Sequence, residues 1–195
     1  MEINLLYPLI VPTTYTWDLP SYPFANKLYM LTWVFFRAEQ SMTYINREEF
    51  NILNNEYPNW QQQAFDNLRN SGTHFYTAYW IDEKSKAISF IAFVNNDGIG
   101  SSRILLSYEL SRAFPEGYEV AMPDRSFGIV SSKNISAADK KILKQVIKDN
   151  YGCTGTAMSK LVLPASDFLL PGEWNTPITK DRSDWMIETV RDYSV

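Results

Sequence analysis

Two pairs of strand-like runs constrain the fold of this chain more than any other feature. The first pair, residues 75–81 and 87–94, lies on either side of a charged connection over residues 82–86. The second pair, residues 118–122 and 127–131, flanks Pro123, Asp124 and Arg125. Apolar runs with so short a connection are typical of hairpins. The sequence therefore predicts antiparallel strand pairs.

Segments with helical spacing lie between and after these strands. The clearest one follows Ser136, a good N-cap residue, and ends near Gly152. The others are residues 47–69 with a break at Tyr57-Pro58, residues 104–114, and residues 181–193. Strand pairs with helices between and after them favour the α+β class over a doubly wound parallel sheet. We expect a single α+β domain over residues 1–195.

The first 26 residues contain four prolines between Pro8 and Pro23, with tyrosines, Trp17 and Phe24 interleaved. Proline removes a backbone donor and clashes with the preceding helical turn, so this segment cannot be one helix. We expect residues 1–26 to form an extended arm laid over the core. The alternative is a mobile arm that becomes ordered on meeting a partner.

Charge and composition limit the partners and the compartment. The formal net charge is −4 and the pI is near 5.1, which argues against binding nucleic acid through its phosphates. The apolar run over residues 28–36 is far shorter than the roughly 20 residues of a membrane span. Cys153 is the only cysteine and no secretory signal is recognisable, so we expect a cytoplasmic protein that does not associate with membranes.

The usual signatures of catalysis and of metal or cofactor binding are absent from the sequence. His74 is the only histidine, and no nucleophile elbow accompanies any serine. Cys153 follows the end of a predicted helix, where the dipole disfavours a thiolate. The loop over residues 95–103 has glycines but lacks the spacing of a phosphate-binding loop. We predict no catalytic residue, no metal ligand and no cofactor.

Two polar turns form the candidate site. One holds Asp97, Ser101, Ser102 and Arg103, and the other holds Asp124 and Arg125. If the turns meet in space, two carboxylates and two guanidinium groups lie close together. Asp–Arg contacts in such a cluster are bidentate and rigid. Such a cluster serves either as a structural clasp or as a pocket for an anionic substrate.

The order of these short motifs resembles a family of uncharacterised bacterial proteins, annotated only as a domain of unknown function. The resemblance covers about residues 60–132 and implies a bacterial, intracellular α+β domain. It implies no activity and carries over no site residues. The matching positions are Ala64, Asn67 and Leu68, then Asp97, Gly98, Ser101, Ser102, Arg103 and Leu105, then Pro123, Asp124 and Arg125.

One short region reverses the acidic balance of the chain. Residues 133–152 hold five basic and two acidic residues. Lys140, Lys141, Lys144 and Lys148 fall on or beside the polar side of the helix predicted there. They form either an ordinary solvated face or a docking face for an acidic partner.

The function favoured by these features is binding of a protein partner without catalysis, of the kind performed by immunity or antitoxin proteins against a cognate toxin. Tyr and Trp are common anchors at interfaces, and acidic rims steer proteins onto basic enzymes. Glu48 and Glu49 are acidic positions of this kind. The alternative is a small enzyme or ligand-binding protein that uses the polar turns on an anionic substrate. A third possibility is a small regulatory or structural interaction domain.

Overall fold

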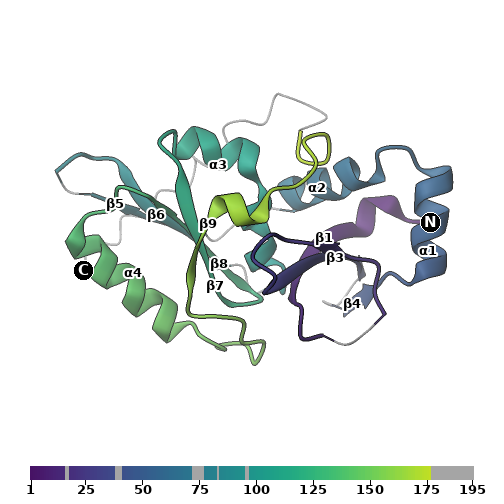
Figure 1. The fold of residues 1–195 in the computed structure, drawn as a ribbon, viewed down its shortest axis with the longest axis horizontal. Helices are drawn as coiled ribbons and strands as arrows, with labels where there is room; N and C mark the ends of the chain where they lie inside the picture. The colour runs from purple at the N-terminus through teal and green to yellow at the C-terminus, as the bar shows by residue number, and fades with distance from the viewer. Residues whose placement is uncertain (16–17, 38–40, 72–76, 83, 95–96, 177–195) are drawn as a thin grey trace. The chain divides into compact units, whose positions relative to one another are not determined.

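The computed structural model describes residues 1–15, 18–37, 41–71, 77–82, 84–94 and 97–176 (Figure 1). It has the α+β class that the sequence predicts, with two antiparallel sheets and several helices. The chain divides into two compact units. Unit 1 holds the described residues up to 71 together with 167–176, and unit 2 holds those between 77 and 166. This division does not test the expected single domain, which stays a prediction.

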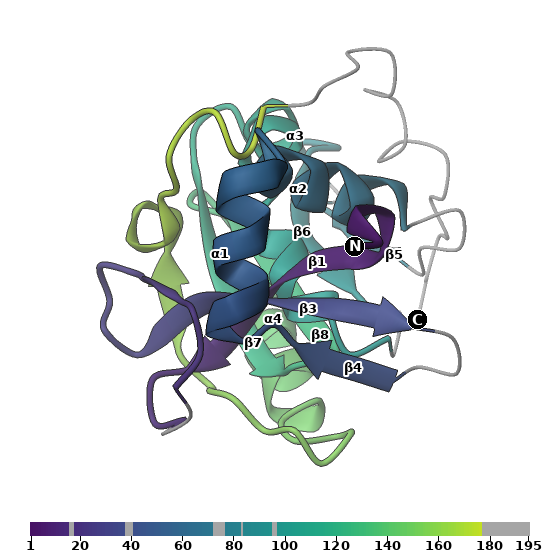
Figure 2. The ribbon, with the colours of Figure 1, turned by 90° about the vertical axis from the view of Figure 1, so that its right-hand side faces the viewer.

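The sheet of unit 1 is centred on β3 (Tyr29–Arg37). β1 (Leu6–Pro12) pairs with β3 along its full length, from Leu6 opposite Phe35 to Pro12 opposite Tyr29. The other edge of β3 is shared by β2 (Tyr22–Pro23) and β4 (Ser41–Tyr44). Figure 2 shows β4 beside β3. Within the expected arm over residues 1–26, β1 and β2 are therefore strands of this sheet.

Two helices of unit 1 meet at a corner. The predicted break at Tyr57-Pro58 is confirmed, because α1 (Arg47–Glu56) ends just before it and α2 (Trp60–Asn70) begins after three intervening residues. Asn46 and Glu49 form a capping box at the start of α1. α2 packs against β1 and against η1 (Ile3–Leu5). Asn67 fastens this contact, because its amide nitrogen donates to the carbonyls of Ile3 and Leu6.

Aromatic side chains make up much of the core of unit 1. Trp33 of β3 meets Trp60 of α2 edge to face, with ring centroids 4.9 Å apart, and Phe50 of α1 lies 5.7 Å from Trp60. Both tryptophans are at most 2% exposed. Burial of rings this large supplies a major share of the hydrophobic stabilisation of a small unit.

The sheet of unit 2 has the order β5-β6-β8-β7-β9, and both predicted strand pairs are confirmed as neighbours in it. The predicted connection over residues 82–86 is a turn in which the Asp82 carboxylate accepts from the backbone N–H groups of Lys84 and Ser85. The strands are β5 (Thr77–Ile81), β6 (Ile88–Phe93), β7 (Tyr118–Asp124), β8 (Phe127–Ser132) and β9 (Val162–Pro164).

Helical elements cover the two faces of this sheet. α4 (Ala137–Asp149) packs on the face that carries Ala92, Ala121 and Ile129 (Figure 1). η3 (Gly100–Leu105) packs on the other face, beside Gly128. Side chains alternate between the faces of a strand, so neighbouring residues of β8 contact different helical elements.

Two further predicted helices can be compared with the structure, and a third cannot. α4 begins as expected, with the Ser136 hydroxyl accepting from the Asp139 N–H at 3.1 Å. The helix expected over residues 104–114 is divided into η3 and α3 (Ser107–Ala113), because Leu106 leaves the helical conformation with ψ of 59°. The helix expected over residues 181–193 lies outside the described residues. A short turn, η4 (Ala165–Phe168), follows β9.

None of the helices in the described ranges combines the length and the apolar character that crossing a bilayer requires.

Candidate functional site

The first polar turn is organised around the side chain of Arg103. This residue is 0% exposed, and its guanidinium donates to both carboxylate oxygens of Asp97, at 3.1 and 2.6 Å. Asp97 also accepts from the backbone N–H of Ile99 at 3.0 Å. The predicted Asp–Arg contact is therefore bidentate, and it holds the loop that leads into η3.

The second polar turn is organised around Asp124, which is also 0% exposed. Its carboxylate accepts from the backbone N–H groups of Ser126 and Thr154 at 2.9 and 3.2 Å. The hydroxyls of Thr154 and Thr156 donate to it as well, at 2.6 and 2.9 Å. Burial raises the pKa of Asp124, but these hydrogen bonds outweigh burial and hold the pKa below its ordinary value.

The two turns meet through the backbone. Ser101 N–H donates to the carbonyl of Arg125 at 3.0 Å. A side chain added at Gly100 would lie 2.0 Å from the Ser126 carbonyl oxygen, and one added at Gly128 would lie 2.6 Å from the Gly100 carbonyl oxygen. Glycine at both positions is what allows the loop before η3 to lie directly on the β7–β8 connection.

The side chains of the two turns do not form a shared cluster of ion pairs. Asp124 is bound by threonine hydroxyls, whereas Arg125 is half-buried and uses its backbone, donating to the Thr156 carbonyl at 3.1 Å. Asp124 is the last residue of β7, whereas Arg125 belongs to the turn that follows. In the described residues, Arg125 Nε and Ser101 Oγ are buried atoms with no hydrogen-bond partner. Ser102 is buried, and its N–H donates to Ile99.

This geometry suits a structural frame better than a binding pocket. The Arg103 guanidinium faces a carboxylate of its own loop and is closed to solvent, so a substrate anion would have to displace Asp97. The Asp124 carboxylate already has four donors. The frame fixes the loop of residues 97–103 and the segment of residues 152–157 to the sheet of unit 2.

Two other groups of unit 2 have shifted pKa values. Burial raises the pKa of Tyr118 to about 12, and the charge of buried Glu109 adds to the shift, so the phenol stays protonated. Desolvation and the charge of Asp124 raise the pKa of the Cys153 thiol, although the residue itself is exposed. A reactive cysteine needs the opposite shift. His74 lies outside the described residues.

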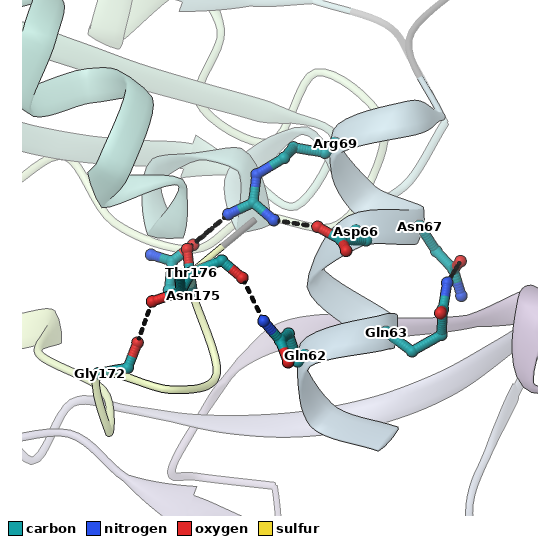
Figure 3. Close-up of polar contacts among 8 residues, drawn as sticks. All are labelled: Gln62, Gln63, Asp66, Asn67, Arg69, Gly172, Asn175 and Thr176. Atoms are coloured by element: carbon teal, nitrogen blue, oxygen red, sulfur yellow. Dashed lines mark hydrogen bonds and ion pairs between the residues drawn. The ribbon is translucent and has the colours of Figure 1, made fainter. Parts of the chain in front are cut away.

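Unit 1 contains a second buried arginine, which sequence reasoning missed. Arg69 of α2 donates to Asp66 at 2.5 Å and to the carbonyl and side-chain oxygens of Asn175 at 2.7 and 2.8 Å (Figure 3). Gln62, two turns earlier, donates to the Thr176 carbonyl at 2.7 Å. These contacts fasten the segment of residues 172–176 along α2. No local sequence signal connects residues this far apart.

An open depression of about 320 Å³ lies at the corner between α1 and α2. Its lining is mixed: Ile3 and Pro58 are apolar, whereas Glu56, Gln62 and Gln63 bring a carboxylate and two side-chain amides, whose nitrogens donate to Thr176 and Asn67. Tyr57 accepts from the amino group of Met1. Its lining residues are Ile3, Glu56, Tyr57, Pro58, Asn59, Gln62 and Gln63.

Exposed carboxylates lie at both ends of α1, and that of Glu56 lines the depression. Glu48 and Glu56 of α1 are exposed, whereas Glu49 is committed to the capping box. Arg47, the one basic residue of α1, forms an exposed ion pair with Asp18. In the described part of the chain, no three His, Cys, Asp or Glu side chains gather closely enough to hold a metal ion.

No protein-family model, no curated protein and no solved structure matches the chain. The resemblance to an uncharacterised bacterial family therefore stays a prediction.

Proposed function

We propose that this protein binds a basic protein partner and neutralises it, as immunity and antitoxin proteins do with a cognate toxin. The observation that carries the proposal is the depression at the α1–α2 corner, whose lining includes the Glu56 carboxylate and the side-chain amides of Asn59, Gln62 and Gln63. We assign this depression, with exposed Glu48 and Glu56, as the contact surface, and we place its action in the cytoplasm.

The chemistry of the depression suits a cationic side chain. Arginine presents five N–H donors and lysine three, and neither accepts a hydrogen bond. The Glu56 carboxylate and the side-chain oxygens of Asn59, Gln62 and Gln63 supply matching acceptors around the opening. An arginine or lysine of the partner would thus gain one ion pair and several hydrogen bonds.

Long-range electrostatics also favour a basic partner. The chain carries a net charge of −4, Glu56 places a negative charge at the opening, and exposed Glu48 adds a second one in the first turn of α1. Complementary charge raises the rate of encounter with a basic protein such as a nuclease and disfavours acidic competitors.

The alternative is an enzyme or ligand-binding site at the polar turns, and it is less well supported. An anionic substrate would need the guanidinium of Arg103, which is fully buried against Asp97. The other cation of the two polar turns, Arg125, is half-buried.

The experiment begins with capture of partners by the tagged chain from its source cells, identified by mass spectrometry. A captured basic protein is then expressed alone and together with the chain, and its affinity is measured by calorimetry. We expect it to arrest growth alone and to be tolerated with the wild-type chain. Glu56→Lys should weaken binding by about tenfold or more and abolish protection.

Glu116→Lys is the matched control, because it makes the same charge change at an exposed position of unit 2. Equal protection by wild type, Glu56→Lys and Glu116→Lys would remove the α1–α2 corner as the contact surface. Absence of any stoichiometric partner would contradict the function itself.

A further inference from the structure

The polar side of α4 carries a continuous positive surface. Successive residues of an α-helix are rotated by about 100°, so Lys140, Lys144, Lys148 and Lys141 lie at roughly 0°, 40°, 80° and 100° around the axis. All four are exposed. The two acidic residues of α4 lie outside this arc, with Asp139 bound to Ser89 and Asp149 to Gln145. We call these four residues the lysine face.

The ammonium groups of the lysine face have no partner among the residues that the structure describes. Within the described ranges, none of its four ammonium groups forms an ion pair or a hydrogen bond with the protein. Leu143 and Ile147, on the adjacent side of the helix, are buried against the sheet and fix the orientation of α4. The charges are therefore presented by a helix that cannot easily rotate.

A rigid segment with apolar side chains continues this surface beyond the helix. Lys160 lies over the ring of Tyr151, with its ammonium 4.3 Å from the ring centroid. Leu161 and Val162 follow and are 54% and 38% exposed. The segment is tied to β7, because Gly152 and Met158 both donate to the Pro123 carbonyl and Ser159 donates to Met122.

We infer that the lysine face, together with Tyr151 and the residues 160–162, docks an acidic segment of a partner protein that also carries apolar side chains. Charge complementarity selects an acidic partner. The exposed Leu161 and Val162 favour a protein over a nucleic acid, because a phosphate backbone has no apolar groups to cover them. The net charge of −4 further opposes binding of a long polyanion.

This surface is separate from the one in the proposed function. It lies on unit 2 and takes an acidic partner, whereas the α1–α2 corner lies on unit 1 and takes a basic one. The two proposals therefore fail independently.

The test measures binding of the full chain to a fluorescein-labelled peptide of alternating glutamate and leucine, by fluorescence anisotropy at low and at physiological salt. A labelled single-stranded oligonucleotide of the same charge is titrated in parallel. We expect the peptide to bind more tightly than the oligonucleotide, and added salt to weaken its binding.

Two double variants locate the surface. Lys144→Glu/Lys148→Glu should weaken peptide binding by about tenfold, because two attractive charges become repulsive. Lys84→Glu/Lys86→Glu, on the exposed β5–β6 connection, makes the same charge change and should alter binding less than about twofold. Leu161→Ser should also weaken binding while leaving the charge unchanged.

Circular dichroism of each variant checks that α4 is intact, and Lys144→Gln/Lys148→Gln replaces the double glutamate variant if it is not. The inference is overturned if the wild-type chain does not bind the peptide at low salt. It is also overturned if the two double variants lose affinity equally, or if the oligonucleotide binds more tightly than the peptide.

Discussion

The two units each bury one arginine against an aspartate, but the two arginines connect different parts of the chain. In unit 2, Arg103 binds Asp97, six residues away, and closes a single loop. In unit 1, Arg69 binds Asp66 within its own helix and then reaches Asn175, 106 residues away. Arg103 stabilises a local conformation. Arg69 fastens the segment of residues 172–176 to α2.

This difference predicts different consequences of losing each side chain. Removal of Arg103 leaves Asp97 with no guanidinium and opens a void beneath the loop, so the damage falls on the core of unit 2. Removal of Arg69 frees a segment at the edge of unit 1 while α2 keeps its packing through Trp60, Phe65 and Leu68. The variants below test this contrast, from the largest expected effect to the smallest.

Arg103→Ala should cost about 3–5 kcal/mol of unfolding free energy, because it breaks a buried ion pair and leaves a cavity. Urea denaturation followed by circular dichroism measures this loss. Arg112→Ala, at an exposed position of α3, is the control and should change stability by less than about 0.5 kcal/mol. Similar midpoints for both variants would show that the Asp97–Arg103 pair is not structural.

Arg69→Ala should cost about 2–3 kcal/mol, since it removes charge-assisted hydrogen bonds without emptying the core. Its distinguishing effect is local. Amide hydrogen exchange should accelerate at residues 172–176, including Trp174, whose N–H donates to the Pro171 carbonyl. Unchanged exchange in this segment would contradict the fastening role, whatever the loss of global stability.

Asp124→Asn should cost about 1–2 kcal/mol at neutral pH, because an uncharged acceptor binds its donors less strongly. The folded-state pKa of Asp124 lies below the ordinary value of 3.8, so its contribution to stability is present above that value. The contribution falls as pH decreases through the lowered folded-state pKa. The stability difference between wild type and variant should therefore shrink in acid, as urea titrations from pH 7 to pH 2 would measure.

Arg47→Ala should leave the urea midpoint unchanged within error, although Arg47 forms a bidentate contact with Asp18. Both side chains are largely exposed, at 69% and 75%, and solvent screens exposed ion pairs. A clear loss of stability in Arg47→Ala would contradict the view that burial decides how much each of the three arginine–aspartate pairs contributes to stability.

Most of the fold of the described residues was predictable because its signals are local. Hairpin connections, the Tyr57-Pro58 break and the Ser136 cap each act within a few residues, and each is present as predicted. The division of the helix over residues 104–114 was missed, because it depends on the backbone of Leu106 leaving the helical conformation, and leucine is a residue that favours helices.

The candidate site was predicted only in part. The Asp97–Arg103 contact lies within one loop, so the motif that carries it is visible in the sequence. The partners of Asp124 are Thr154 and Thr156, which follow a whole helix later and look like ordinary turn residues. Asp124 and Arg125 are adjacent in sequence, but the Asp124 carboxylate accepts from threonine hydroxyls whereas Arg125 Nε has no hydrogen-bond partner in the described residues, a difference that the sequence does not reveal.

The contact between Gly100 and the β7–β8 connection also limits how this sequence can evolve. At both Gly100 and Gly128 the obstacle to a side chain is backbone rather than another side chain, so no compensating substitution nearby can make room. Relatives that keep this fold should therefore retain glycine at both positions while their surfaces diverge. Two invariant glycines, 28 residues apart in this chain, would then identify distant relatives that share no other recognisable motif.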